Sequence, residues 1–167
     1  RMPVQVAHCI EVMVEWAKSK DMSAAILVLV PGEREMEQVI SEWLVFSQRK
    51  RLASLKYHRV DSTTPRQERK MIRQELKEEI FKRAGIDILV VATDVFGRSI
   101  TLPINGLVDT GLSIYPDSNG FLTVDASLKA DQTQRKGRAG RVTETLYRKL
   151  VPDSMSDEAE MDYVMEK

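Results

Sequence analysis

The stretch 24–32, AAILVLVPG, is a continuous apolar run that ends abruptly in Pro31-Gly32. The run is too short for a buried helix and is rich in β-branched residues, so it favours a strand covered on both faces. Pro31 and Gly32 break it, because both residues are strong turn formers. We therefore expect a central strand of a parallel sheet here.

Outward from this run, helical and strand patterns alternate along the chain. Helices are predicted over 4–20, 33–48, 65–83 and 129–138. Further strands are predicted over 55–60, 87–93, 105–109 and 145–151. Residues 112–115 and 121–124 predict a β-hairpin, in which Asn119 and Gly120 supply the left-handed conformations of a tight turn. The alternation implies an α/β fold, a parallel sheet with helices on both faces, plus the hairpin.

Length and composition indicate a single soluble domain. The chain of 167 residues suits one α/β core, and its 25 basic and 25 acidic residues balance, so net charge gives no argument for nucleic-acid binding. The single cysteine, Cys9, excludes an internal disulfide framework or a multi-cysteine zinc site, and we expect it to be a buried thiol. We interpret His8 and His58 as structural, and we expect no metal site.

No targeting or membrane segment is visible. No apolar run approaches the roughly 20 residues of a membrane span, and no signal peptide is seen, so we expect an intracellular, cytoplasmic protein. Residues 1–151 are expected to form the domain. Residues 152–167 are acidic, and we expect a tail or a linker to a following domain, with a helix and the start of a linker both left open.

The stretch 134–141, QRKGRAGR, concentrates basic residues and glycines. Arg138 and Arg141 are spaced to share one face of a helical turn, and their rigid guanidinium groups match phosphate oxygens. Gly137 and Gly140 lower helix propensity, and they allow close approach to a ligand or another domain. An ordinary basic surface helix is the alternative. The pattern otherwise indicates a site that grips a polyanion.

The pattern Q-R-x-G-R-x-G-R resembles the last signature motif of the DEAH/DExH-type superfamily 2 helicases. Two upstream stretches resemble other motifs of the same family in the right order: ILVLVPG at 26–32 and VVATDVFGRSIT at 90–101. GLVDTGL at 106–112 and TLYRKLV at 145–151 resemble further strands of the family. The resemblance covers about residues 24–151, and it implies the second RecA-like domain of such a helicase.

The chain departs from the DEAH pattern in places. Gly97-Arg98 stands where most members have Glu-Thr, and Pro103 stands in place of an acidic residue. Asp94 replaces a common asparagine. A divergent cellular member and a viral DExH helicase therefore both remain open.

The resemblance implies an ATP site shared with another domain. No G-x-x-x-x-G-K-[ST] loop and no Asp-Glu-x-His occurs in the chain, so ATP and Mg²⁺ would be bound mainly by a first RecA-like domain of the same polypeptide. Arg138 and Arg141 would act as arginine fingers, and Gln134 would orient the γ-phosphate or the attacking water. Ser99 would also contact the nucleotide.

The resemblance also implies backbone contacts to single-stranded RNA. The residues expected to make them are Gly32, Ser62, Thr63, Thr93 and Arg98. Hydroxyls and strand-end amides suit phosphates and read no base sequence. The helix 66–83 carries charges of both signs, which favours a solvated face over a binding surface.

Taken together, the motifs predict the second motor domain of an ATP-dependent RNA helicase, inactive when isolated. One alternative is a non-catalytic helicase-like module that only binds a partner or nucleic acid; the intact arginine pair argues against it. Another is a DNA translocase domain of the same superfamily. The hairpin and the form of the last motif favour RNA, on resemblance alone.

Overall fold

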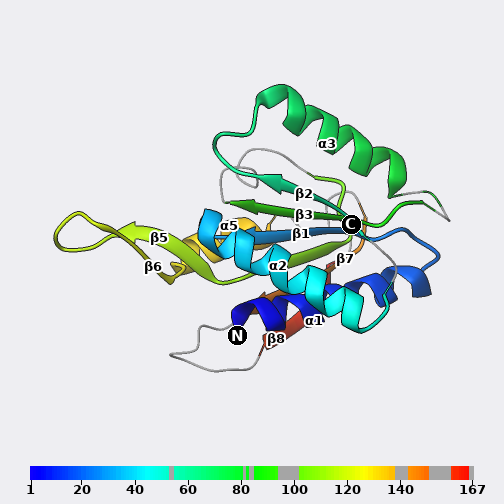
Figure 1. The fold of residues 1–167 in the computed structure, drawn as a ribbon, viewed down its shortest axis with the longest axis horizontal. Coiled ribbons are helices and arrows are strands. Elements are labelled where there is room, and N and C mark those ends of the chain that lie inside the picture. The colour runs from blue at the N-terminus through cyan, green and yellow to red at the C-terminus, as the bar shows by residue number, and fades with distance from the viewer. Residues whose placement is uncertain are drawn as a thin grey trace.

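Strand β1 (Ala25–Val30) lies at the centre of the main sheet, between β3 (Ile88–Thr93) and β4 (Gly106–Asp109), and it is parallel to both. All its residues are buried, as expected for a strand covered on two faces. The sheet has six strands in the order β2-β3-β1-β4-β7-β8 (Figure 1). The predicted central parallel strand is confirmed.

The computed structural model describes residues 1–52, 55–80, 82, 85–93, 102–137, 143–150 and the backbone of 159–165. The other helices are α1 (Met2–Ser19), α2 (Glu33–Arg49), α3 (Arg66–Glu79) and α5 (Lys129–Lys136). The other strands are β2 (Lys56–Val60), β5 (Leu112–Pro116), β6 (Leu122–Ala126), β7 (Thr145–Leu150) and β8 (Ala159–Met165).

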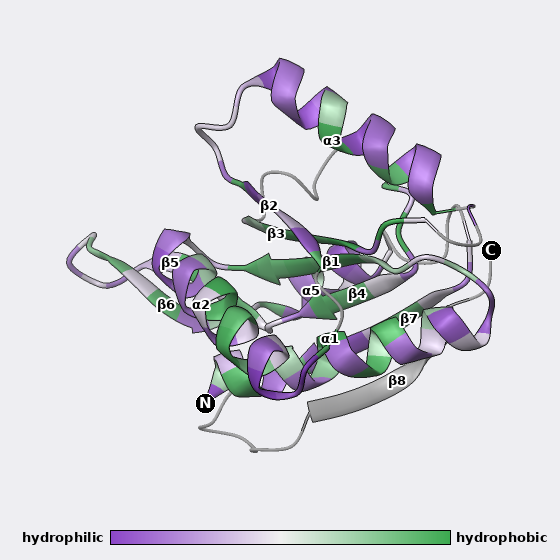
Figure 2. Ribbon diagram, turned by 45° about the vertical axis from the view of Figure 1, so that its right-hand side comes forward, coloured by the Kyte–Doolittle hydropathy of each residue, from purple (hydrophilic) through white to green (hydrophobic). Residues whose placement is uncertain are grey.

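Helices α1 and α2 cover one face of the sheet. Ile10 and Met13 of α1 and Val39 of α2 are buried in one apolar cluster with Val28 and Val91 of the strands. Their spacing of three and four residues along the helices places them on the inward side. Figure 2 shows the apolar central strands in green beside these helices.

Helix α3 covers the opposite face. Its apolar residues Ile72 and Leu76 are buried, and they pack with Leu27 and Val90 in a second cluster. Apart from the exposed Met71, the rest of the helix is hydrophilic (Figure 2). The predicted arrangement of helices on both faces is therefore confirmed.

Cys9 is buried within the core on the α1 side, with 1% of its surface exposed. Burial raises the pKa of its thiol, and the nearby Arg148, whose Nη1 lies 3.5 Å from Sγ, opposes this only in part. The thiol is therefore neutral at physiological pH, as the sequence predicted for a buried cysteine.

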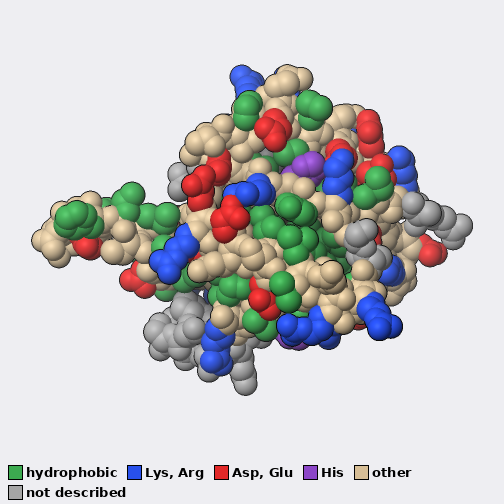
Figure 3. Space-filling view, viewed as in Figure 1, with side chains coloured by type: hydrophobic (Ala, Val, Ile, Leu, Met, Phe, Trp, Pro, Cys, Tyr) green, Lys and Arg blue, Asp and Glu red, His purple; other side chains and the backbone are tan. Residues whose placement is uncertain are grey.

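Strands β5 and β6 form a separate antiparallel hairpin that projects from the body (Figures 1 and 3). Its turn is closed by Asp117, whose Oδ1 accepts hydrogen bonds from the amides of Asn119 and Phe121 at 2.8 and 2.9 Å. Gly120 is left-handed, with φ of 82°, but Asn119 is not. The expectation of two left-handed residues is wrong, because an additional residue lengthens the loop and leaves glycine alone in that conformation.

Strand β8 pairs antiparallel with β7 at one edge of the main sheet. The sequence suggested a helix or a linker for residues 152–167, and a strand was not among these alternatives. The pairing partner is what makes this segment a strand, and an acidic segment carries no local signal for such a partner.

Among the residues that the structure describes, no helix is both long and apolar enough to cross a membrane.

Candidate functional site

The parallel strands all point their carboxyl ends toward one edge of the sheet, where ligands bind in open α/β folds. Gly32 follows β1 at this edge and caps α2, accepting the hydrogen bond from the Met36 amide at 3.0 Å. A β-carbon at Gly32 would lie 3.1 Å from Cδ1 of Ile114 on the hairpin. Glycine therefore lets the hairpin approach the β1–α2 turn closely.

Thr93 ends β3 at the same edge. Its hydroxyl oxygen is buried, and it has no hydrogen-bond partner among the described residues. A buried hydroxyl without a partner costs about 1–3 kcal/mol, so a ligand group that pairs with it would recover that energy. The position and the unmet hydroxyl fit the predicted contact with a phosphate backbone.

The turn after β2 contains two further residues of the predicted nucleic-acid set, Ser62 and Thr63, both exposed. The Thr63 hydroxyl donates to Oδ1 of Asp61 at 2.6 Å, and the Thr63 amide donates to the same oxygen at 2.8 Å. These hydrogen bonds lower the pKa of Asp61, the Thr63 hydroxyl contributing most. Because both Thr63 donors are used within the turn, Ser62 is better placed than Thr63 to donate to a phosphate.

Helix α5 carries Gln134 on its exposed side and buries Arg135. Nη1 of Arg135 donates to Oδ1 of Asp109 and to Oγ of Ser127, both at 2.9 Å. Nη2 donates to Oγ of Ser113 at 2.8 Å and to the carbonyl of Leu112 at 3.2 Å. One guanidinium thus joins the end of β4, the first strand of the hairpin and the segment that enters α5.

Gly111 completes this junction next to Asp109. Its amide donates to Oδ1 of Asp109 at 2.9 Å, and its φ is 72°. A β-carbon here would lie 2.6 Å from the carbonyl oxygen of Leu150. Both the left-handed conformation and the contact require glycine.

The predicted site residues are therefore placed as follows. Gly32, Ser62, Thr63 and Thr93 follow or end strands β1, β2 and β3 at one sheet edge, and Gln134 lies on the helix tied to the end of β4. Ser99, Arg98, Arg138 and Arg141 lie outside the described residues. The structure therefore locates Gly32, Ser62, Thr63, Thr93 and Gln134, and it does not locate the other four predicted site residues.

The junction residues Asp109, Ser113, Ser127 and Arg135 were not among the site residues predicted from the sequence. A usable signal was present, since a buried strand that ends in aspartate needs a counter-charge. Arg135 lies inside the quoted motif, but the motif's pattern drew attention to Arg138 and Arg141 instead.

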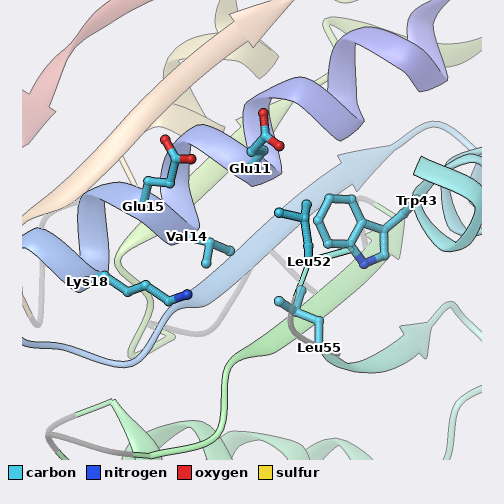
Figure 4. Close-up of a pocket in the computed structure, with 7 residues that line it drawn as sticks. All are labelled: Glu11, Val14, Glu15, Lys18, Trp43, Leu52 and Leu55. Atoms are coloured by element: carbon cyan, nitrogen blue, oxygen red, sulfur yellow. The ribbon is translucent and has the colours of Figure 1, made fainter. Parts of the chain in front are cut away.

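A small cavity of about 90 Å³ lies elsewhere, between α1, α2 and the segment before β2 (Figure 4). Glu11, Trp43 and Leu52 line it together with other residues of these elements. It lies toward the amino ends of the strands, because α1 ends just before β1 begins. Among the described residues, no group of three or more His, Cys, Asp or Glu side chains could hold a metal ion.

Comparison with known proteins places these features in a family. The model of the helicase conserved C-terminal domain matches residues 5–143. Among solved structures, the chain is similar to the DExH-box NTPase HrpB of E. coli, with 19% identity and a TM-score of 0.61. That match covers 97% of this chain and 18% of HrpB, so the chain spans less than a fifth of that protein's length. No curated protein matches the sequence.

The likeness to HrpB, at this identity, shows the fold: a RecA-like sheet with helices on both faces. The family match spans β1 to β4, the hairpin and α5, and with them the Arg135 junction and the ends of β1, β2, β3 and β4; β7 lies beyond it. It bears out the resemblance to a superfamily 2 helicase, and the chain belongs to the helicase conserved C-terminal domain family.

Proposed function

We propose that this chain is the second motor domain of an ATP-dependent RNA helicase, acting with a first RecA-like domain of the same polypeptide. The observation that carries the proposal is the anchoring of α5. The buried Arg135 holds this helix to the end of β4, so the stretch 134–141 starts at the edge of the sheet where ligands bind. Residues 1–151 would form the motor domain, and 152–167 would add β8 to the edge of its sheet before leading out of it.

In this proposal ATP lies between the two RecA-like domains. Mg²⁺ would be held mainly by the first domain, where it would neutralise charge on the phosphates. Arg138 and Arg141 stabilise the charge that develops on the transferring phosphoryl group, and Gln134 orients the attacking water or the γ-phosphate. Gln134 is exposed on α5, as this role requires. Ser99 would add a nucleotide contact.

Single-stranded RNA would cross the same edge of the sheet. The partnerless hydroxyl of Thr93 supports this, because a phosphate oxygen or a ribose hydroxyl would satisfy it. Gly32, Ser62, Thr63 and Arg98 would add contacts to the sugar-phosphate backbone. The resemblance to DEAH-type members, together with the hairpin, favours RNA over DNA, and we propose an intracellular, cytoplasmic setting.

The test is replacement of Arg138 or Arg141 by lysine in the full-length polypeptide. Lysine keeps the charge but loses the planar fork, so ATP turnover should fall by roughly 10³- to 10⁵-fold while ATP affinity changes little. Arg49→Lys, an exposed arginine at the end of α2, is the matched control. RNA affinity at fixed salt should hold in the lysine variants.

Near-normal turnover in both variants would remove the arginine-finger assignment. A wild-type polypeptide that binds RNA but hydrolyses no ATP would indicate a non-catalytic module. Hydrolysis stimulated by DNA and not by RNA would indicate a translocase. The isolated chain 1–167 should hydrolyse no ATP, because the phosphate-binding loop and the magnesium ligands would lie on the other domain.

A further inference from the structure

Helix α5 is held to the body in an unusual way. It has eight residues, and within it Arg135 alone is buried. A helix this short is not stable by itself in water, and it has no buried apolar side chain to fix its orientation. The position of α5 therefore depends on polar contacts, which are directional.

The contacts of Arg135 come from two different bodies. Asp109 belongs to the main sheet, whereas Leu112, Ser113 and Ser127 belong to the base of the hairpin. The two serine hydroxyls are also hydrogen-bonded to each other at 2.8 Å. Because a guanidinium is planar and its donors are fixed relative to one another, a shift of the hairpin base changes the geometry of the whole fork.

Further hydrogen bonds tie the same helix to the hairpin. The Tyr115 hydroxyl donates to Oδ2 of Asp131 at 2.9 Å and accepts from the amide of Leu128 at 2.8 Å. Nε2 of Gln132 donates to the Ser127 carbonyl at 2.9 Å, and Oε1 of Gln132 accepts from Nζ of Lys149 on β7 at 3.0 Å. The hairpin and α5 are thus joined along the first two turns of the helix.

We propose that Arg135 is a positioning residue for ATP hydrolysis, and that it makes the hairpin and the start of the arginine motif one rigid unit. Gln134 is its neighbour in sequence, and Arg138 follows three residues later in the chain. Through Asp109 the unit keeps a fixed position on the sheet. Through Ser113 and Ser127, whatever displaces the hairpin also displaces Gln134 and the end of α5. This inference rests on the proposed function, in which those residues act on the nucleotide.

The test uses the double variant Ser113→Ala, Ser127→Ala in the full-length polypeptide. It removes both serine acceptors from the hairpin side of the fork, and it keeps the Leu112 carbonyl contact and the Arg135–Asp109 ion pair. A small misplacement of groups that act in the transition state costs up to about 100-fold, so kcat for ATP should fall about 10- to 100-fold, with KM within about threefold. Because buried donors of Arg135 lose partners, the thermal unfolding midpoint should fall by a few degrees, with the variant still folded at the assay temperature.

The matched control is Ser19→Ala, Ser47→Ala, which removes two surface hydroxyls that bond only to nearby helix carbonyls. Arg135→Lys keeps the charge beside Asp109 but cannot reach all the fork's acceptors, and kcat should fall at least as far. The inference is overturned if the double variant keeps the kcat of the control, or if the fraction of unfolded protein at the assay temperature accounts for the fall in kcat.

Arg138→Lys is measured alongside to separate the two proposals. If Arg138→Lys and Arg141→Lys both retain full turnover, the proposed function fails whatever the serine variant does. If both lysine variants lose turnover and the serine variant does not, the positioning role of Arg135 is excluded and the proposed function stands.

Discussion

The central strands and the junction between α5 and the hairpin are both buried, yet different forces hold them. In the strands, Leu27 and Leu89 expose 1% and 0% of their surface and contact other apolar side chains. In the junction the buried side chains are Arg135, Asp109, Ser113 and Ser127. The first region is stabilised by apolar burial, the second by a network of charged hydrogen bonds.

The difference determines what each region specifies. Apolar packing is non-directional, so a core accepts volume-conserving changes with small losses of stability. A guanidinium fork accepts one arrangement of acceptors, because losing one partner leaves buried polar groups unsatisfied. The core therefore tolerates conservative substitutions, whereas the junction does not and fixes the orientation of α5.

The largest expected effect comes from breaking the junction at its centre. Arg135→Met should lower the free energy of unfolding by about 3–5 kcal/mol, because the buried Asp109 would lose its ion pair with the Arg135 guanidinium. Urea denaturation measures the loss. The double variant Arg135→Met, Asp109→Leu should recover part of it, and a double variant no more stable than the single one would contradict this account of the ion pair.

In the core, the loss of unfolding free energy depends on how much side-chain volume a substitution removes. Leu89→Ala should lower the free energy of unfolding by about 2–5 kcal/mol, whereas Leu89→Met should cost less than about 1.5 kcal/mol. Denaturation curves of both variants, set beside those of Arg135→Lys, test the comparison. The comparison is contradicted if Arg135→Lys lowers the free energy of unfolding by as little as Leu89→Met does.

Replacing one glycine in each region by alanine compares the stability of the junction with that of the core. Gly111→Ala should cost about 2–3 kcal/mol, because alanine resists the positive φ and its β-carbon would meet the Leu150 carbonyl oxygen. Gly106→Ala in the core should cost about 1 kcal/mol, since its β-carbon would meet Sδ of the flexible Met13 at 2.8 Å. Thermal unfolding of the two variants gives the ranking, and the reverse order would contradict it.

The smallest effect belongs to a polar cluster at the surface, where Oε2 and Oε1 of Glu75 accept hydrogen bonds from Lys56 at 2.6 Å and from His58 at 2.7 Å. Burial alone raises the pKa of Glu75, but the hydrogen bonds from Lys56 and His58 outweigh it and leave the pKa below 4.5. A lowered folded-state pKa stabilises the fold above the unfolded value, and this stabilisation is lost as pH falls through the folded value.

Glu75→Gln should therefore cost less than about 1 kcal/mol near pH 7. Its difference from the wild type should shrink as the pH falls below the usual glutamate pKa of 4.5, and it should vanish once the pH is below the lowered pKa of the folded state. Urea denaturation across this range is the measurement. A difference that grows on acidification would reverse the sign and contradict the assignment.

Much of the fold was predictable because its signals are local. The apolar runs of β1 and β3 and the helical spacing in α1 and α2 gave these elements to within a few residues. Strand order was not predictable, and neither was β8, because both depend on partners distant in sequence. Helix α3 was predicted to reach Arg83 but ends at Glu79, whose carboxylate accepts a hydrogen bond from the Ile86 amide at 3.0 Å.

The site was predictable only where it follows strand ends. Gly32 and Thr93 were expected at the sheet edge from their place after β1 and at the end of β3, and the structure has them there. Arg135 was not identified, because an arginine in a basic stretch looks exposed. Its burial depends on Asp109 and two serines that are brought together by the hairpin.

The central place of β1 also affects the order in which the chain can fold. The residues at its start bond to partners far downstream: the amide of Ala24, just before β1, to Asp87, 63 residues away, and the amide of Ala25 to Asn105, 80 residues away. A ribosome adds roughly 5–20 residues per second, so these partners are synthesised about 3–16 s after β1 itself. During that time a β-branched, uncharged strand has two open edges, which is the form most prone to aggregation. Nascent chains stalled before residue 88 should therefore bind chaperones that recognise apolar strands, and chains stalled well after residue 109 should release them.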